Sequence, residues 1–204
     1  MLVHKGDKSM EIRSYQVENE IGWVRCRVLS FLDTAYFDNV FQKKEVYENP
    51  AIELVAVENG QIVGLLDIEY EVRERTVCSR GIGLGGMIWH IAVHPDFRRK
   101  GIATKLLKEA EKIAALKGLN RLEAWTRDDA WVNKWYVNSG FKNVESYLHV
   151  FIDGDSELQG AIKSELPDLL PVQAFAHYIG EENEQIKNRF KRVYECNCYE
   201  KMLK

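Results

Sequence analysis

Three cations and a glycine, Arg98-Arg99-Lys100-Gly101, separate an apolar segment from a segment with helical spacing. The apolar segment, 87–93, is rich in Ile, Val and Trp and ends at His94-Pro95, where a strand cannot continue its ladder. The first turn of a helix has unpartnered backbone N–H groups and a positive dipole end, so it attracts phosphate. A glycine there allows a close approach of the backbone. The segment predicts an anion-binding turn; the alternative is a solvated basic turn before an ordinary helix.

The segment around this turn resembles the acyl-CoA signature of the GNAT N-acetyltransferase family. The core of that signature is Arg or Gln, two residues, Gly, one residue and then Gly or Ala, and Arg98, Gly101 and Ala103 fit it. In the family, a strand and a helix with an aromatic-Tyr pair follow. Here Arg121–Thr126 matches the strand and Trp135-Tyr136 matches the pair.

The resemblance covers residues 50–150 and the final strand. It implies an α/β fold of the GNAT type, in which helices flank a mixed central sheet. It further implies that an amine attacks acetyl-CoA directly, without an acyl-enzyme and without a metal. The acceptor would be a primary amine of a small molecule or a peptide. The alternative is a catalytically silent module that binds acyl-CoA as a sensor.

By resemblance, the central strand and the basic turn bind acetyl-CoA. The strand would contribute backbone amides that pair with the pantetheine arm and stabilise the carbonyl oxygen, and the turn would hold the pyrophosphate. Asn133 would contact the pantetheine or the pyrophosphate, whereas Asp129 replaces a frequent asparagine and leaves its contact open. Tyr136 would donate a proton to the leaving thiolate. The cofactor-binding residues implied are Ile91, Ala92, Val93, Arg98, Arg99, Lys100, Gly101, Ile102, Ala103, Thr104, Asn133 and Tyr136.

The base that takes the proton of the amine is harder to place. Family members with a base on the central strand have it at positions matching Met87 or Trp89, neither of which accepts a proton. His90 has the opposite parity and should face the other side of the sheet, unless a bulge re-aims it. We expect Glu69 on the preceding strand to be the base, with Asp67 on the same face. A chain of water molecules is the alternative.

Two further patterns carry competing interpretations. The glycines at 81, 83 and 86 fit GxGxxG, but they precede an apolar strand instead of following one, so we expect a loop and no dinucleotide site. That loop would be an ordinary connection or a lip beside the substrate channel. His90 and His94 have the HxxxH spacing of some metal ligands, but they lack helical context and partners at zinc spacings, so no metal site is expected.

Composition sets outer limits. The 204 residues suit a single domain, 1–204, and a net charge of −3 argues against a nucleic-acid partner. The charged first ten residues lack the apolar core of a signal segment, and the longest apolar run is too short to cross a bilayer, so no membrane partner is expected. Cysteine spacing predicts reduced core or strand residues. Together these features predict a cytoplasmic protein.

Periodicity predicts the remaining elements. We expect a strand over 10–15, helices over 18–32 and 33–47, a hairpin of 51–57 and 61–72 around Asn59-Gly60, and a strand over 144–152. A helical insertion over 154–190 should precede the last strand, in which Tyr194, Cys196, Cys198 and Met202 alternate inward. The insertion carries apolar stripes, which would pack on the domain, cover the acceptor site or join two copies in a homodimer. These stripes are Leu158, Ile162 and Leu166, and then Val172, Phe175, Ala176 and Ile179.

Overall fold

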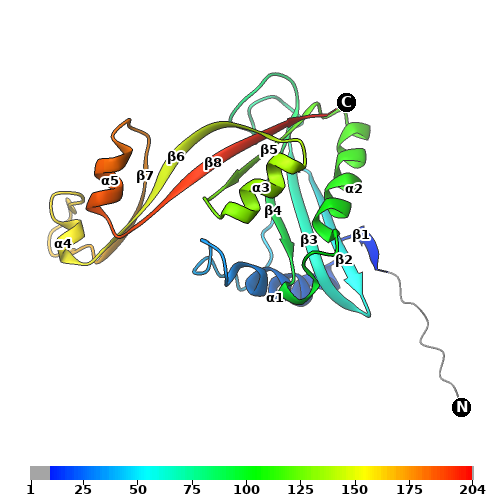
Figure 1. The fold of residues 1–204 in the computed structure, drawn as a ribbon, viewed down its shortest axis with the longest axis horizontal. Coiled ribbons are helices and arrows are strands. Elements are labelled where there is room, and N and C mark those ends of the chain that lie inside the picture. Colours follow the sequence, from blue (N-terminus) through cyan, green and yellow to red (C-terminus); the bar gives the residue numbers. More distant parts are fainter. Residues whose placement is uncertain (1–9, 204) are drawn as a thin grey trace, which may run out of the picture.

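The computed structural model describes residues 10–203, so the charged start of the chain, on which the expectation of no signal segment depends, lies outside the described residues. An eight-stranded mixed sheet runs through the molecule in the order β1-β2-β3-β4-β5-β8-β6-β7 (Figure 1). Its strands are β1 (Glu11–Ser14), β2 (Ala51–Glu58), β3 (Gln61–Tyr70), β4 (Gly85–Val93), β5 (Arg121–Thr126), β6 (Lys142–Asp153), β7 (Gln173–Tyr178) and β8 (Arg192–Met202). The helices are α1 (Glu20–Phe31), α2 (Ile102–Leu116), α3 (Ala130–Asn138), α4 (Asp155–Leu158) and α5 (Asn183–Arg189), with short 3₁₀ turns at Val17–Asn19 and Pro95–Phe97.

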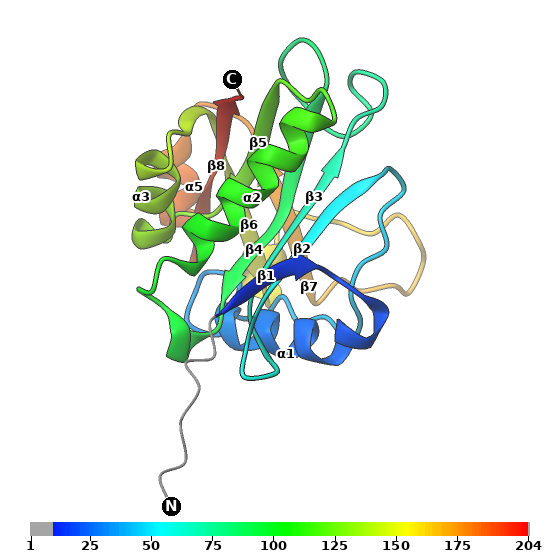
Figure 2. The same ribbon diagram turned by 90° about the vertical axis from the view of Figure 1, so that its right-hand side faces the viewer.

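The central strands are buried on both faces because helices cover both. Leu66 of β3 packs in one cluster with Leu106 of α2 and Tyr136 of α3, while Leu65 packs in another with Trp23 of α1. Successive side chains of a strand point to opposite faces, so α1 lies on one face of the sheet and α2 and α3 lie on the other (Figure 2). This is the α/β architecture predicted from the sequence.

The hairpin of β2 and β3 confirms the prediction from Asn59-Gly60. Both residues have positive φ angles, 54° and 79°. This is the backbone of the tight turn that matches the twist of two antiparallel strands. The turn fixes the register in which Asp67 and Glu69 share one face of β3.

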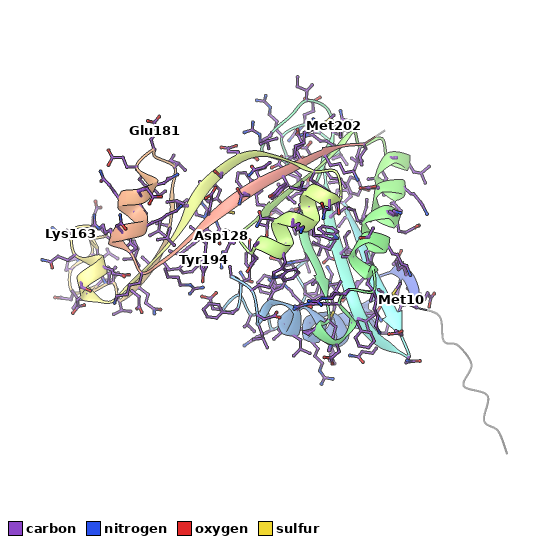
Figure 3. The ribbon with its side chains drawn as sticks, viewed as in Figure 1. Met10, Asp128, Lys163, Glu181, Tyr194 and Met202 are labelled. Atoms are coloured by element: carbon purple, nitrogen blue, oxygen red, sulfur yellow. The ribbon has the colours of Figure 1, made fainter. Side chains whose placement is uncertain are left out.

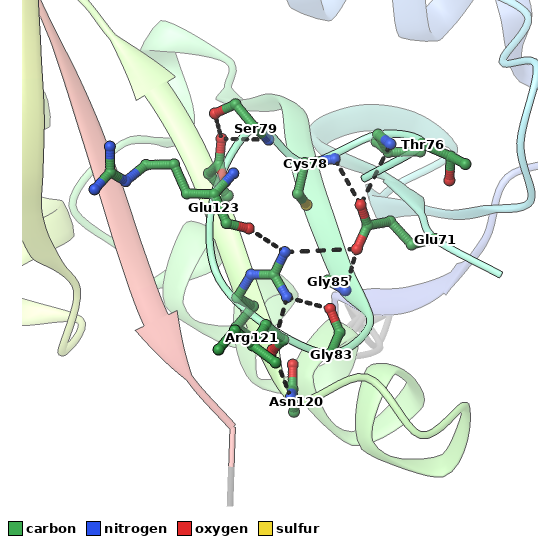
Figure 4. Close-up of polar contacts among 12 residues, drawn as sticks. Glu71, Thr76, Cys78, Ser79, Gly83, Gly85, Asn120, Arg121 and Glu123 are labelled. Carbon is green, nitrogen blue, oxygen red and sulfur yellow. Dashed lines mark hydrogen bonds and ion pairs between the residues drawn. The ribbon is translucent and has the colours of Figure 1, made fainter. Parts of the chain in front are cut away.

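The glycine-rich segment is a loop that a buried charged cluster holds in place (Figure 4). Glu71 accepts hydrogen bonds from the amides of Cys78 (3.1 Å) and Gly85 (2.8 Å), and Arg121 donates to carbonyls of the loop. Glu123 accepts from the hydroxyl of Ser79 at 2.6 Å. The loop enters β4 instead of opening a helix, so it lacks the context of a dinucleotide site. Among the described residues, none of 72–84 lines the large cavity at the other end of β4, so this loop is not a lip of that cavity.

The helix predicted over 33–47 is wrong; this segment is a series of turns, which we call the 32–50 loop. Polar groups of this segment form hydrogen bonds with other elements, in place of the backbone hydrogen bonds that a helix would have. The amide of Ala35 donates to Asp129, and Arg27 of α1 donates to the carbonyl (2.8 Å) and side chain (2.6 Å) of Asn39. These tertiary bonds override a helical pattern that local spacing supports.

The insertion is only partly helical and forms an arm, residues 154–190, on the extended ends of β6 and β8 (Figure 1). Helices occupy 155–158 and 183–189, but the second predicted stripe forms strand β7. Ala174 and Ala176 face inward there and Phe175 faces outward, which is a period of two. The helical prediction failed because β6 supplies an edge for pairing, which local spacing cannot reveal.

The last strand follows the prediction in part. Cys196 and Cys198 are buried, but Met202 is 60% exposed because the strand runs past the core there. All four cysteines, Cys26, Cys78, Cys196 and Cys198, are buried and free, as expected. Within residues 10–203, no helix is both long and apolar enough to cross a membrane.

Candidate functional site

Strands β4 and β5 separate halfway along their length and open a cavity of about 820 Å³. They pair in parallel from Gly85 with Arg121 to Ile88 with Ala124, and β4 then continues to Val93 without β5 as a partner. Its opposite edge stays paired with β3 as far as Val93. In the described chain, the edge of β4 over 89–93 therefore faces the cavity with backbone groups that no strand takes up. An extended ligand can pair with such an edge.

The N-terminus of α2 lies at the same cavity. Gly101 caps the helix with a φ of 74°, and Gly101, Ile102, Ala103 and Thr104 line the cavity. The first amide of this region with a backbone acceptor is that of Lys105, which donates to Gly101. Apart from Gly101 and its two chain neighbours, no residue has an atom within 4 Å of the place that a Cβ of Gly101 would occupy. The turn thus combines free amides, the positive helix end and open space, which is the set of features that binds phosphate.

The three cations of the turn have different surroundings. Arg98 donates two hydrogen bonds to Asp33 (2.5 and 2.9 Å) and one to the carbonyl of Ser30 (2.8 Å), which ties the turn to the end of α1. Arg99 lines the cavity with a φ of 63°. Lys100 does not line it and lies 4.0 Å from Glu58. Arg99 is therefore the cation best placed to reach an anion in the cavity.

Helix α3 brings Tyr136 into the cavity wall. The ring is 3% exposed and stacks on Tyr199 with centroids 5.1 Å apart. Burial raises the pKa of the Tyr136 phenol, so the hydroxyl is a proton donor throughout the neutral range. Ile91, Ala92 and Val93 of β4 line the same cavity. The predicted proton donor and the predicted strand amides therefore share one space.

Asn133 does not lie where a contact with acetyl-CoA would place it. Its amide nitrogen donates to the carbonyls of Arg127 (2.7 Å) and Asp129 (2.9 Å), and its oxygen accepts from Tyr199 (2.9 Å) and Asn197 (3.3 Å). It does not line the cavity. Because its hydrogen-bonding capacity is used within the protein, we interpret Asn133 as a residue that positions the start of α3. Asp129 lines the cavity, but its carboxylate accepts from the amide of Ala35 in the 32–50 loop.

A bulge in β4 turns His90 toward α1. Met87 pairs with Glu69 and Ile88 with Ile68, whereas His90 pairs with Asp67, so Trp89 is an extra residue. An extra residue shifts the alternation by one. His90 therefore shares a face with Met87 instead of opposing it, which is the exception that the sequence interpretation allowed for.

His90 joins two groups that the sequence did not indicate, Glu45 and Arg27. Its Nε2 lies 2.6 Å from a carboxylate oxygen of Glu45 in the 32–50 loop, and the Nε of Arg27 donates to its Nδ1 at 3.4 Å. With Nδ1 accepting, Nε2 carries the proton and donates to Glu45. This hydrogen bond is the main reason that the pKa of Glu45 is lowered. Glu45 is thus a carboxylate at neutral pH and lines the cavity.

Glu69 lies outside the cavity wall, contrary to its expected role. One of its oxygens accepts from the amide and side chain of Asn49, both at 2.9 Å, and the other accepts from Trp89 at 2.8 Å. Burial acts to raise the pKa of Glu69, but these hydrogen bonds outweigh it and lower the pKa. Asp67 shares its face, as predicted, and binds Lys44 and Tyr47. Neither carboxylate is free to meet a substrate amine.

The opposite wall of the cavity comes from β6 and β8, with Tyr147, His149 and Cys196. Arg127 donates to Nδ1 of His149 at 3.1 Å, and the hydroxyl of Tyr147 lies 3.0 Å from Nε2. Burial, Arg127 and His177 together lower the pKa of His149 to about 3. His149 is therefore a neutral ring in the wall.

Known proteins resemble this chain in sequence and in fold. The model of the acetyltransferase (GNAT) family matches residues 18–141, which is more than half of the chain. The chain belongs to this family. An acetyltransferase of Pectobacterium atrosepticum is 29% identical over 124 residues, which are 59% of this chain and 78% of the relative. Family membership identifies the protein as an acetyltransferase.

Solved structures of this family share the fold. A GNAT acetyltransferase from Streptococcus pneumoniae aligns over 96% of this chain and all of its own, with a TM-score of 0.61 and 17% identity. The PaiA N-acetyltransferase of Thermoplasma acidophilum, solved in complex with coenzyme A, aligns over 73% of this chain and 94% of its own, with a TM-score of 0.52 and 17% identity. The family match ends at residue 141, so the arm and the strands β6 and β8, which form the opposite wall of the cavity, lie beyond it.

Proposed function

We propose that the protein transfers an acetyl group from acetyl-CoA to a primary amine of a small molecule or a peptide. The observation that carries this proposal is the open edge of β4 beside the free amides of α2, with Tyr136 in the same cavity. The α2 turn would bind the pyrophosphate with its amides and Arg99. The edge of β4 over Ile91–Val93 would pair with the pantetheine arm and direct an amide at the carbonyl oxygen. The protein would act in the cytoplasm as a single domain.

The reaction needs a neutral amine, and Glu45 is placed to deprotonate the ammonium form of the substrate. The carboxylate of Glu45 takes a proton from the ammonium, and the nitrogen lone pair attacks the thioester carbon. A C–N bond forms, the C–S bond breaks, and its electron pair goes to sulfur. Tyr136 gives its phenolic proton to the departing sulfur, so that CoA leaves as a thiol. The ammonium loses two protons in all: one passes through solvent to reprotonate Tyr136, and the other goes from Glu45 to solvent.

The test is a screen of amines with acetyl-CoA, in which mass spectrometry detects acetylated product and a thiol reagent detects free CoA. The screen should include small amines and peptides with free N-termini. We expect acetylated product from at least one amine at a rate above that of hydrolysis. If the protein binds acetyl-CoA but acetylates none of them, the transfer proposal fails and sensing of acyl-CoA is favoured.

A further inference from the structure

The residues that line the cavity also indicate which class of acceptor it binds. This inference rests on the function proposed above. Among the described residues that line it, two carry carboxylates, Glu45 and Asp129. Both oxygens of Asp129 accept from the amide of Ala35, at 3.0 and 3.1 Å. Glu45 has one oxygen on His90 and a side chain that is 43% exposed. The wall therefore offers one carboxylate to a cationic substrate, which suits a single ammonium group better than a polycation.

The cations of the wall are likewise not available to a carboxylate of the acceptor. Arg27 is 2% exposed, binds Asn39, and lies between the rings of Phe31 (4.5 Å) and Phe41 (3.7 Å). The other cations of the wall, Arg98 and Arg99, belong to the α2 turn. An acceptor with its own carboxylate would have to bury that charge without a partner, which is costly.

Aromatic rings make up much of the remaining wall. Phe41, Trp89, Trp125 and Tyr147 line it from the 32–50 loop (the acceptor loop from here on), β4, β5 and β6. Trp125 lies on Tyr147 with centroids 5.1 Å apart, and Trp89 is 49% exposed. Such rings favour a flat apolar body through stacking and the burial of apolar area.

The rings continue from the cavity onto the arm. His177 of β7 stacks on His149 with centroids 4.7 Å apart and an angle of 2°, and it lies 4.6 Å from Tyr147. Phe175 contacts both His149 (4.9 Å) and His177 (5.1 Å) and is 50% exposed. We call Tyr147, His149, Phe175 and His177 the aromatic strip.

The arm is held beside the cavity, so that the strip can take part in binding. Arg192 of β8 donates to Asp38 of the acceptor loop at 2.6 Å and lies 4.5 Å from the ring of Phe37. Figure 3 shows Tyr194 of the same strand near Asp128, in the concave space between arm and core. The strip thus extends the acceptor side of the cavity.

We propose that the acceptor is a primary monoamine without a carboxylate, carrying an aromatic group, which binds with its ammonium on Glu45 and its ring along the wall that ends in the aromatic strip. A polycation, an aminosugar and an amino acid each lack one of these features. The segments that select the substrate, the acceptor loop and the arm, are those in which this chain's structure departs most from local sequence patterns.

The proposal is tested with matched amines and acetyl-CoA, each assayed for CoA release and acetylated product. We expect kcat/KM for 2-phenylethylamine to exceed that for phenylalanine, which adds only a carboxylate, by at least about 100-fold. It should exceed those for spermidine and glucosamine by a similar factor, and that for hexylamine by about 10-fold. Preference for spermidine, glucosamine, phenylalanine or a peptide would overturn the inference and leave the proposed function intact. Acetylation of no amine would instead overturn the proposed function.

Variants test the two contacts separately. Phe175→Ala should raise KM for 2-phenylethylamine about 5- to 10-fold with KM for acetyl-CoA unchanged, because Phe175 is half exposed and its strand β7 lies far from α2 (Figure 1). Ile179→Ala is the control, since Ile179 follows the same strand, is 87% exposed and lies outside the strip. Equal KM values for 2-phenylethylamine in Phe175→Ala and the wild type would show that the strip is not part of the acceptor site.

Glu45→Gln should lower kcat/KM for 2-phenylethylamine by about 100-fold. Its control is Glu48→Gln, which removes the same charge from an exposed position of the acceptor loop. An unchanged shift of the melting temperature by CoA would show that Glu45→Gln folds and binds the co-substrate. With that shift intact, wild-type kcat/KM in Glu45→Gln would show that Glu45 does not receive the ammonium.

Discussion

Replacement of Gly101 by Asp tests whether the α2 turn binds a diphosphate. The fold should survive, because no residue other than the chain neighbours has an atom within 4 Å of the new Cβ and because Asp tolerates a φ of 74° better than most residues. The added carboxylate would stand among the free amides. Repulsion between unit charges about 4 Å apart near a protein surface is about 4 kcal/mol, and screening reduces it. We therefore expect a loss of about 2 to 4 kcal/mol, which raises the Kd for CoA about 30- to 1000-fold.

Isothermal titration of CoA measures this change, with two control variants. Gly101→Asn keeps the shape and the left-handed backbone without the charge, so its Kd should rise less than about 10-fold. Gly118→Asp places the same side chain at the other end of α2, where φ is 76° and no atom lies within 4 Å of the new Cβ; its Kd should match the wild type. A folded Gly101→Asp that binds CoA within twofold of the wild type would refute the assignment of this turn.

Four further outcomes are expected. CoA at about 100 times its Kd should add about 2.7 kcal/mol to the free energy of unfolding, and a melting curve unmoved by millimolar CoA would contradict binding. Tyr136→Phe should slow single-turnover acetyl transfer by roughly 10²- to 10⁴-fold with little change in CoA affinity; equal rates would exclude the proton-donor role. Because the folded state holds the pKa of His149 near 3, below the ordinary value of 6.5, the unfolded state binds more protons between these pH values. Stability should fall as pH drops through that window, and chemical denaturation should show a flatter profile for His149→Gln. Arg121→Met leaves the carboxylate of Glu71 buried without its cation and should cost about 3 to 5 kcal/mol in urea denaturation, and a loss below about 1 kcal/mol would show that the cluster is not needed.

Local signals in the sequence predicted the parts of the site that local geometry builds. The turn at Gly101 depends on a few consecutive residues, the resemblance implied the helix that carries Tyr136, and the structure has both elements. The hairpin at Asn59-Gly60 depends on backbone freedom at two positions. Such features follow from propensity and spacing alone.

The acceptor side could not be predicted in this way. Glu45 meets His90 across 45 positions of sequence, and the segment that carries it has the spacing of a helix. His90 faces Glu45 only because Trp89 forms a bulge, which depends on pairing with β3. Phe175 lies on a strand because β6 offers a free edge. Each of these contacts is decided by tertiary pairing, which periodicity within one segment does not contain.

The tether between Arg98 and Asp33 has a consequence for the dependence of binding on ionic strength. The guanidinium of Arg98 is already neutralised by a carboxylate of this chain. The attraction for an anion at the turn then comes from the backbone amides, the helix dipole and Arg99. A site built from three free cations would lose affinity steeply as salt is added. This turn should lose affinity for CoA less steeply than such a site.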